Sequence, residues 1–393
     1  MNPVLNPFSP GAGTPPPELA GRQPILEKAH IMFERLKAAR SEKSFLLIGL
    51  RGVGKTVLLN EIFHLADQDG YKAILIEAHE KKSLAALLLP SLRQLLFQLD
   101  RMENISQKVK RSFRVLKSFL NCVKLRVQDV EISLDNDPEI GTADSGDLES
   151  DLPALLESIA EAAKDRETAV AIIIDELQYL SEHEMSALIM AIHRIAQKKL
   201  PLALVGAGLP QLVGLMGRSK SYAERLFDFP KIGPLGESDA IAALRGPAEE
   251  QNVKINDDAI EEILRQTQGY PYFLQEWGYQ AWNLAKESPI DLLTVQQATQ
   301  ESIKRLDESF FRVRFDRLTP REREYLHALA VLGDGTQRSG DIAEKLKVTP
   351  QSIAPIRNSL IKKGMIYSPA HGDTDFTVPL FADFMKRVMP NSA

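Results

Sequence analysis

Short apolar runs alternate with amphipathic helical patterns along the first half of the chain. Residues 44–50 read SFLLIGL and residues 169–180 read AVAIIIDELQYL, and both runs are typical of strands buried on both faces. Strands that alternate with helices predict a parallel sheet covered on both faces, with a ligand at the carboxyl ends of the strands. The expected strands are 44–50, 71–78, 169–180 and 202–206, and the expected helices are 25–36, 57–67, 152–164 and 184–197.

The second half of the chain has a different pattern. From residue 238 to about 287 the apolar spacing is wholly helical, and a charged helix is expected over 296–314. From residue 318 the pattern predicts a helix, a turn, two more helices and a wing at 367–378, with Thr349 and Pro350 forming a capped start of the last helix. We therefore expect a helical domain followed by a distinct C-terminal domain.

Composition narrows the class of protein. The chain has 393 residues, 44% of them apolar and 26% charged, which is typical of a globular protein with more than one core. The net charge of −5 means that any DNA contact must come from a local basic surface. The single cysteine excludes a disulfide framework, and no signal peptide or transmembrane run is evident, so a cytoplasmic protein without membrane contact is expected.

The motif GLRGVGKT at residues 49–56 has the chemistry of a phosphate-binding loop. Its glycines let successive backbone N–H groups point at phosphates, and the following helix adds its positive end. Lys55 is expected to reach the β- and γ-phosphates of ATP, and the Thr56 hydroxyl to hold Mg²⁺. The expected nucleotide contacts in this loop are Gly49, Gly52, Val53, Gly54, Lys55, Thr56 and Val57.

Two carboxylates follow the strand AIIID. Asp175 is expected to bind Mg²⁺, and Glu176 is placed to polarise the attacking water. An ordinary strand that ends in exposed acids is the alternative, but a P-loop upstream favours the nucleotide interpretation. The pattern therefore predicts an ATPase with Lys55 and Glu176 as catalytic residues, whose turnover is slow or depends on a partner.

These motifs, with a helical domain after them, resemble the AAA+ and related STAND families of P-loop ATPases, most closely their origin-recognition-type and archaeal-ATPase branches. The resemblance begins at about Glu18. It implies that Gly21 and Arg22, in ELAGRQ, lie against adenine. It also implies that Gly269 and Pro271, in TQGYPYFLQ, contact the nucleotide base from a helical lid.

The same resemblance implies an arginine finger in the segment SYAERLFDFPKIGPL, with Arg225 as first choice and Arg218 as second. Such an arginine stabilises charge on the transferring phosphoryl group and often comes from a neighbouring subunit, so a homo-oligomer or another protein partner is expected. A surface ion pair is the alternative role for Arg225.

The chain departs from these families at the end of the strand after AIIID. The families carry a polar sensor residue there, whereas this chain has Gly206, Ala207 and Gly208. Direct side-chain sensing of the γ-phosphate at that position is therefore in doubt, and backbone groups or a neighbour such as Gln178 would have to substitute.

The C-terminal segment closely resembles a winged helix-turn-helix domain, with residues 351–363 as the recognition helix. The wing carries Asp373 and Asp375 in place of basic residues, so a protein-docking role stays open beside contact with double-stranded DNA. The candidate DNA contacts are Gln351, Ser352, Arg357, Lys362 and Lys363.

We expect four parts: a proline-rich arm over 1–20, extended across a folded surface or loose, an ATPase core over 21–232, a helical lid over 233–310 and a winged helix over 311–393. The core contains an insertion around 83–151, with a basic run, a segment at 124–135 that alternates like strands, and an acidic stretch. The expected function is an ATP-dependent switch of a DNA-binding or docking winged helix. A nucleotide-locked or slowly hydrolysing scaffold that binds ATP or ADP is the alternative.

Overall fold

The computed structural model describes residues 1–11, 13–100, 106–122, 137–370 and 372–390. The chain forms two compact units. We call one the sheet unit, which consists of Arg22–Gly49 and Lys55–Lys231. The other is the helical unit, which consists of Met1–Gly21, Leu50–Gly54 and Ile232–Ala393.

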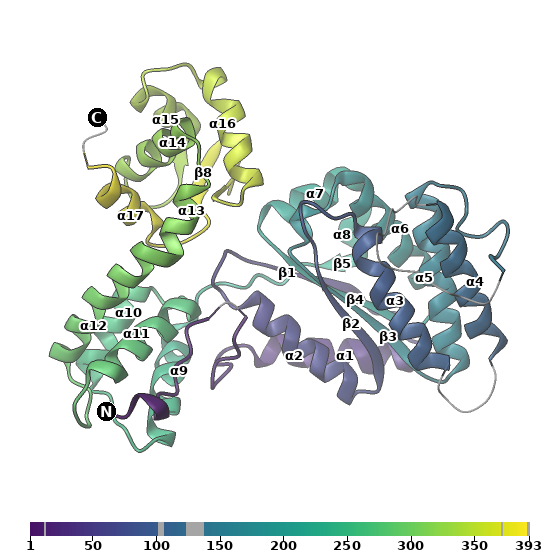
Figure 1. The fold of residues 1–393 in the computed structure, drawn as a ribbon, viewed down its shortest axis with the longest axis horizontal. Coiled ribbons are helices and arrows are strands. Elements are labelled where there is room, and N and C mark those ends of the chain that lie inside the picture. The colour runs from purple at the N-terminus through teal and green to yellow at the C-terminus, as the bar shows by residue number, and fades with distance from the viewer. Residues whose placement is uncertain (12, 101–105, 123–136, 371, 391–393) are drawn as a thin grey trace. The chain divides into compact units, whose positions relative to one another are not determined.

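A five-stranded sheet in the order β2-β3-β4-β1-β5 forms the centre of the sheet unit (Figure 1). Each neighbouring pair of strands is parallel, as the alternation of strands and helices predicts. Every residue of the three inner strands β1, β3 and β4 is buried, which explains why their sequences are continuous apolar runs. The strands are β1 (Ser44–Ile48), β2 (Tyr71–Glu77), β3 (Ala169–Asp175), β4 (Leu202–Gly208) and β5 (Phe227–Asp228).

Helices cover both faces of this sheet. On one face, alternate side chains of the strands share a core with the helices of the insertion and with those around β3 and β4. These helices are α3 (Leu84–Asp100), α4 (Gln107–Cys122), α5 (Leu148–Asp165) and α6 (Glu182–Gln197). The opposite face is covered by α1 (Gln23–Lys37) and α2 (Lys55–Gln68). The predicted three-layer P-loop architecture is confirmed.

The basic run of the insertion lies on α4, the outermost of these helices, and forms ion pairs with nearby acids. Lys108 contacts Glu161 at 3.0 Å, and Arg114 contacts Glu139 at 2.8 Å. Arg111 contacts both carboxylates. The hydrogen bond from Arg114 is the main reason why the pKa of Glu139 is lowered. The segment 124–135, expected to alternate like strands, lies outside the described residues.

In the helical unit, α9 (Glu237–Glu250), α10 (Asp257–Thr267), α11 (Pro271–Leu284) and α12 (Leu292–Arg305) pack together. The charged helix expected over 296–314 is not one continuous α-helix. A π-helical turn at Leu306–Phe311 separates α12 from α13 (Arg312–Asp316).

The proline-rich arm packs on α11. Phe8 is 1% exposed and lies against Gly278, and the Trp282 indole N–H donates to the Asn2 carbonyl at 3.0 Å. The sequence pattern excludes helix from this arm, but a short 3-10 turn forms at Pro3–Leu5, because proline at the first helical positions loses no hydrogen bond. The buried Phe8 therefore anchors the arm in the hydrophobic core of this unit.

The C-terminal part has winged-helix architecture. Helices α14 (Pro320–Val331), α15 (Ser339–Lys345) and α16 (Pro350–Lys362) accompany a three-stranded antiparallel sheet in the order β6-β8-β7. The strands are β6 (Gln337–Arg338), β7 (Ile366–Tyr367) and β8 (Asp373–Phe376). The apolar pattern did not predict the last helix, α17 (Phe381–Val388), which packs on α14.

The helix cap expected at Thr349 differs in detail from the prediction. Thr349 occupies the N-cap position of α16 and Pro350 its first turn, but the threonine hydroxyl makes no capping bond. Instead, the Ser352 hydroxyl donates to the Thr349 carbonyl at 2.7 Å. The side-chain capping box in this domain is on α14, between Thr319 and Glu322.

Among the residues that the structure describes, no helix combines the length and apolar character needed to cross a bilayer.

Candidate nucleotide site

The P-loop connects the end of β1 to the start of α2. Gly52 and Gly54 have φ angles of +83° and +89°, in the left-handed region that glycine adopts without strain. Because α2 begins at Lys55, the loop ends at the positive end of a helix dipole. The backbone at residues 49–56 therefore has the features of an anion-binding loop.

Two side chains at the start of α2 point to groups at the carboxyl edge of the sheet. Lys55 is 7% exposed, and its ammonium donates to the Gly49 carbonyl at 3.0 Å. The Thr56 hydroxyl donates to Oδ2 of Asp175 at 2.6 Å, across 119 positions of sequence. The fold thus joins the two halves of the predicted site in space.

Asp175 is the most buried acid of this edge, at 6% exposure. Burial raises its pKa and the charge of Glu176 adds to that effect, while hydrogen bonds from Thr56 and from the Glu176 N–H oppose it. A buried carboxylate held beside a hydroxyl offers the hard oxygen ligands that Mg²⁺ prefers. Asp175 and Thr56 therefore fit a magnesium site.

A third carboxylate, which the sequence interpretation did not single out, lies beside this pair. Glu77 ends β2 and is in register with Asp175 at the end of β3. Burial raises the pKa of Glu77, and the negative charges of Asp175 and Glu176 raise it further. The sequence does contain a signal for this contact. The strands β2 and β3 have equal length and each ends in an acid, which could have indicated that Glu77 lies beside Asp175.

Glu176, the predicted base, has an unusual backbone. Its φ and ψ angles are 55° and 35°, in the left-handed region that non-glycine residues rarely occupy. Its N–H donates to Oδ1 of Asp175 at 2.7 Å. Such conformations are concentrated at functional sites, where the surrounding structure maintains them.

The two arginine-finger candidates have different surroundings. Arg218 pairs with Glu182 at 2.7 Å. Arg225 lies exposed on the short helix α8 (Ala223–Leu226), and no interaction of its side chain occurs within the described parts of the chain. Of the two candidates, Arg218 therefore forms a surface ion pair, which is the alternative role that the sequence analysis gave to Arg225.

The residues predicted to contact the base are divided between the units. Arg22 belongs to the sheet unit, whereas Gly21, Gly269 and Pro271 belong to the helical unit. Gly269 has φ of +72°, and a Cβ there would lie 2.6 Å from the Leu235 carbonyl oxygen. Pro271 begins α11. The positive φ angle and the close packing account for glycine at position 269, and the start of a helix accounts for proline at position 271. Because both residues have these structural roles, their contact with nucleotide stays a prediction.

The candidate DNA contacts on α16 fall into two groups. Gln351, Ser352 and Lys362 are exposed. Arg357 is held inside the domain: its guanidinium donates to the Thr374 hydroxyl at 2.9 Å and to the Asp373 carbonyl at 2.7 Å. Lys363, the residue directly after α16, is half-buried, and its ammonium contacts Glu322 within the domain at 2.7 Å. These last two side chains hold α16 against the wing strand β8 and helix α14.

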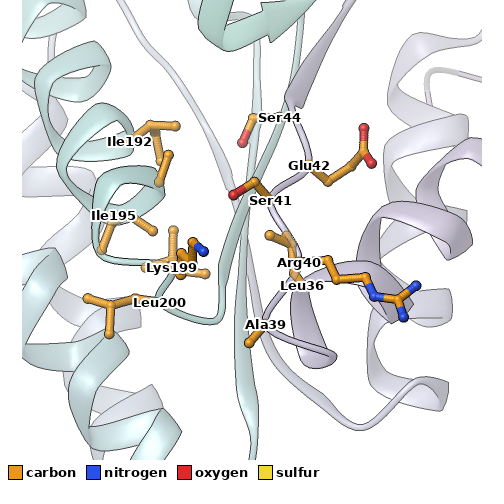
Figure 2. A pocket seen from close by; sticks show the side chains of 12 residues that line it. Leu36, Ala39, Arg40, Ser41, Glu42, Ser44, Ile192, Ile195, Lys199 and Leu200 are labelled. Atoms are coloured by element: carbon orange, nitrogen blue, oxygen red, sulfur yellow. The ribbon is translucent and has the colours of Figure 1, made fainter.

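A small cavity lies at the other edge of the sheet (Figure 2). Among its lining residues, Ser44 begins β1 and Leu202 begins β4, and residues of α1, of α6 and of the loops that follow these two helices complete the lining. In parallel sheets of this type, ligands bind at the carboxyl ends of the strands. This cavity therefore lies at the edge of the sheet opposite the P-loop and is no candidate for the nucleotide site.

The chain is similar to known proteins in both sequence and structure. Residues 18–205 match the family model of the AAA ATPase domain, and residues 308–385 match a domain of unknown function, DUF8462. An uncharacterized HTH-type transcriptional regulator of Methanocaldococcus jannaschii is 20% identical over 344 residues, which cover 83% of this chain and 78% of the relative.

Two solved structures are similar to this chain at low sequence identity, and the first of them, with a TM-score above 0.5, shares its fold. A Walker-type ATPase of Pyrococcus abyssi has a TM-score of 0.57 and 18% identity, covering 97% of this chain and 99% of its own. The Orc1 protein of Aeropyrum pernix, solved in complex with DNA, has a TM-score of 0.47 and 17% identity, covering 95% and 94%. The family match and the observed parallel sheet lead to one conclusion: residues 18–205, which are similar in sequence to the AAA ATPase domain, have the P-loop NTPase fold.

Proposed function

We propose that this chain binds ATP with Mg²⁺ at the carboxyl edge of its sheet and hydrolyses it to ADP and phosphate. The observation that carries the proposal is the meeting of Lys55 and Thr56, at the start of α2, with Asp175 and Glu176, at the end of β3. A phosphate cradle, hard oxygen ligands and a carboxylate base are the components that phosphoryl transfer to water requires.

Each residue has a role that follows from its chemistry. Lys55, which donates to the Gly49 carbonyl, would reach the β- and γ-phosphates of bound ATP, and Thr56 and Asp175 would hold Mg²⁺. When bound, Mg²⁺ neutralises charge on the phosphate oxygens. Glu176 accepts the proton of a water whose oxygen bonds to the γ-phosphorus, while the bond from that phosphorus to the β–γ bridging oxygen breaks. ADP and inorganic phosphate leave.

The test is ATP turnover by the purified full-length chain beside Lys55→Ala and Glu176→Gln. We expect Lys55→Ala to lose nucleotide binding. Glu176→Gln should bind ATP with unchanged affinity. Its turnover should be at least about 100-fold slower than that of wild type, since a general base contributes on the order of 10²–10⁴-fold. Turnover by Glu176→Gln equal to wild type would favour the alternative, a nucleotide-locked scaffold.

We further propose that nucleotide state switches the activity of the winged helix. Such coupling requires that ATP and ADP bind two states of the protein with different affinity. It also requires that the affinity of the winged helix for its target differs between these two states. The similarity to an HTH-type transcriptional regulator supports DNA as that target. The exposed Gln351, Ser352 and Lys362 of α16 are the residues we assign to contact it.

One observation favours a protein target instead. Arg357 and Lys363, two of the three basic candidates on α16, hydrogen-bond within their own domain, and the wing strand carries Asp373 and Asp375. Duplex binding measured across salt concentrations separates the two targets, because phosphate contacts produce a steep salt dependence.

The matched variants are Lys362→Ala and Arg357→Ala. If DNA is the target, Lys362→Ala weakens duplex binding and reduces the salt slope by about one, without changing stability. Arg357→Ala is expected to lower the unfolding temperature, because it removes hydrogen bonds within the domain. Salt-independent or absent duplex binding would favour the docking role.

A further inference from the structure

Side chains from the turn after β3 occupy the space beside the glycines that end β4. A Cβ on Gly206 would lie 2.3 Å from Cδ1 of Leu177, and one on Gly208 would lie 2.8 Å from Oε1 of Gln178. Real Cβ atoms do not approach other atoms this closely. In this structure the side chains of Leu177 and Gln178 therefore occupy the space that a side chain on either glycine of β4 would need.

The amide of Gln178 makes two hydrogen bonds from this space. Its Oε1 accepts from the backbone N–H of Leu209, the first residue after β4, at 3.0 Å. Its Nε2 donates to Oε2 of Glu176, the proposed base. Gln178 therefore connects the tip of β4 to the carboxylate that must face the attacking water.

The tip of β4 is connected to the P-loop in turn. The N–H of Gly49 donates to the Gly208 carbonyl at 3.2 Å, and the Gly49 carbonyl accepts from the Lys55 ammonium. The P-loop is therefore hydrogen-bonded to the same strand end that Gln178 contacts.

We infer that Gln178 is a positioning residue for hydrolysis, which holds Glu176 in place from the turn after β3 and replaces a polar side chain on β4. The inference rests on the proposed function of Glu176 as base. A glutamine amide suits this role because it presents an acceptor to the Leu209 N–H and a donor to the Glu176 carboxylate at the same time. The left-handed backbone of Glu176 needs such a restraint, because that conformation is not intrinsically stable for glutamate.

The experiment compares Gln178→Ala and Gln178→Glu with wild type, with Gln197→Ala as control because Gln197 is an exposed glutamine on α6. We expect Gln178→Ala to lower kcat by about 10-fold or more, with the KM for ATP and the unfolding temperature little changed. Gln178→Glu keeps the acceptor for Leu209 but, when ionised, cannot donate to Glu176, so it should be as slow as Gln178→Ala. A Gln178→Glu variant with wild-type kcat would show that Gln178 only supports the strand end and would overturn the inference.

A double-mutant cycle with Glu176→Gln completes the test. If Gln178 acts through Glu176, Gln178→Ala should cause no further loss of kcat in the Glu176→Gln background. Additive losses would contradict the inference while leaving the proposed function intact. A wild-type rate equal to that of Lys55→Ala would overturn the proposed function, and this inference with it. If wild type is much faster than Lys55→Ala, and Gln178→Ala has the same kcat as wild type, the inference is overturned while the proposed function stands.

Discussion

The hydroxyl of Thr56 lies 2.6 Å from the Asp175 carboxylate, so the two side chains that we propose as Mg²⁺ ligands are already in place together. Asp175 also accepts the N–H of Glu176, which fixes the orientation of its carboxylate. An arrangement assembled in advance needs little reorganisation when phosphate and metal arrive, and electrostatic catalysis depends on such preorganisation.

This arrangement makes Asp175→Asn a direct test of metal binding. We expect the variant to lose the Mg²⁺-dependent part of its ATP affinity and to hydrolyse ATP at least about 100-fold more slowly, because a neutral amide is a poor Mg²⁺ ligand. Its unfolding temperature should not fall, because burial disfavours the charged carboxylate, as its raised pKa indicates. ATP affinity measured with Mg²⁺ and with EDTA checks the prediction. Thr56→Ser keeps the hydroxyl and is the control, and an Asp175→Asn variant that still responds to Mg²⁺ would contradict the assignment.

Arg225 is expected to act on the site of a neighbouring subunit. Arg225→Ala should lower turnover by about 10³-fold at high protein concentration without weakening ATP binding, the effect of removing an arginine finger. Mixing Arg225→Ala with Lys55→Ala should restore activity. The Lys55→Ala subunit supplies Arg225, and the Arg225→Ala subunit supplies an intact nucleotide site. Arg218→Ala, which removes a surface pair with Glu182, should have little effect. Turnover strictly linear in protein concentration, with no rescue in the mixture, would exclude an arginine supplied in trans.

Gly278→Ala is expected to displace the N-terminal arm from α11. A Cβ there would lie 2.7 Å from the ring of Phe8, so the variant should be less stable by about 1–3 kcal/mol. Gly217→Ala, within α7 (Gln211–Ser219), has no described atom within 4 Å of the new Cβ and should be neutral or stabilising. Chemical denaturation measures both. Because Phe8→Ala removes the ring that clashes, the double variant should lose less stability than the sum of the single losses; strict additivity would argue against the contact.

Glu322 is expected to give the winged helix a pH-dependent stability. It accepts from Lys363 and from the Ser359 hydroxyl, each at 2.7 Å, and from the Thr319 N–H at 2.8 Å. Burial alone would raise its pKa, but these donors outweigh burial and hold the pKa below its ordinary value of 4.5. A lowered carboxyl pKa stabilises the fold at pH values above the ordinary pKa, and that stability is lost as the pH falls through the lowered value.

Glu322→Gln should therefore cost about 1–3 kcal/mol at neutral pH, and the difference from wild type should shrink as the pH falls below 4.5. Urea denaturation at a series of pH values measures the difference. Glu324→Gln, on the same helix in a largely exposed pair with Arg321, is the control and should change stability little. A difference that did not vary with pH would show that the carboxylate charge is unimportant.

Local signals in the sequence were enough for much of the fold. The expected strands and helices of the sheet unit match β1 to β4, α1, α2, α5 and α6 within a few residues, because buried strands and amphipathic helices have different apolar periods. The strand expected over 169–180 is the exception: β3 ends at Asp175, and a 3-10 turn forms at Leu177–Tyr179. The departures occur where local rules compete with packing. The helix expected over 296–314 contains a π-helical turn, and a short 3-10 turn forms at Pro3–Leu5 in the arm, which anchors on α11 through the buried Phe8.

The sequence by itself determined the chemistry of the P-loop, since glycines, a lysine and a threonine at fixed spacing act through their own backbone and need no distant partner. Only the tertiary structure decided which distant side chains meet. It paired Thr56 with Asp175, placed Glu77 beside them, and brought the Gln178 amide to the tip of β4. It also bound Arg357 within the winged helix. The physical reason is that a hydrogen bond or close contact depends on distances between segments far apart in sequence, which strand order and packing set.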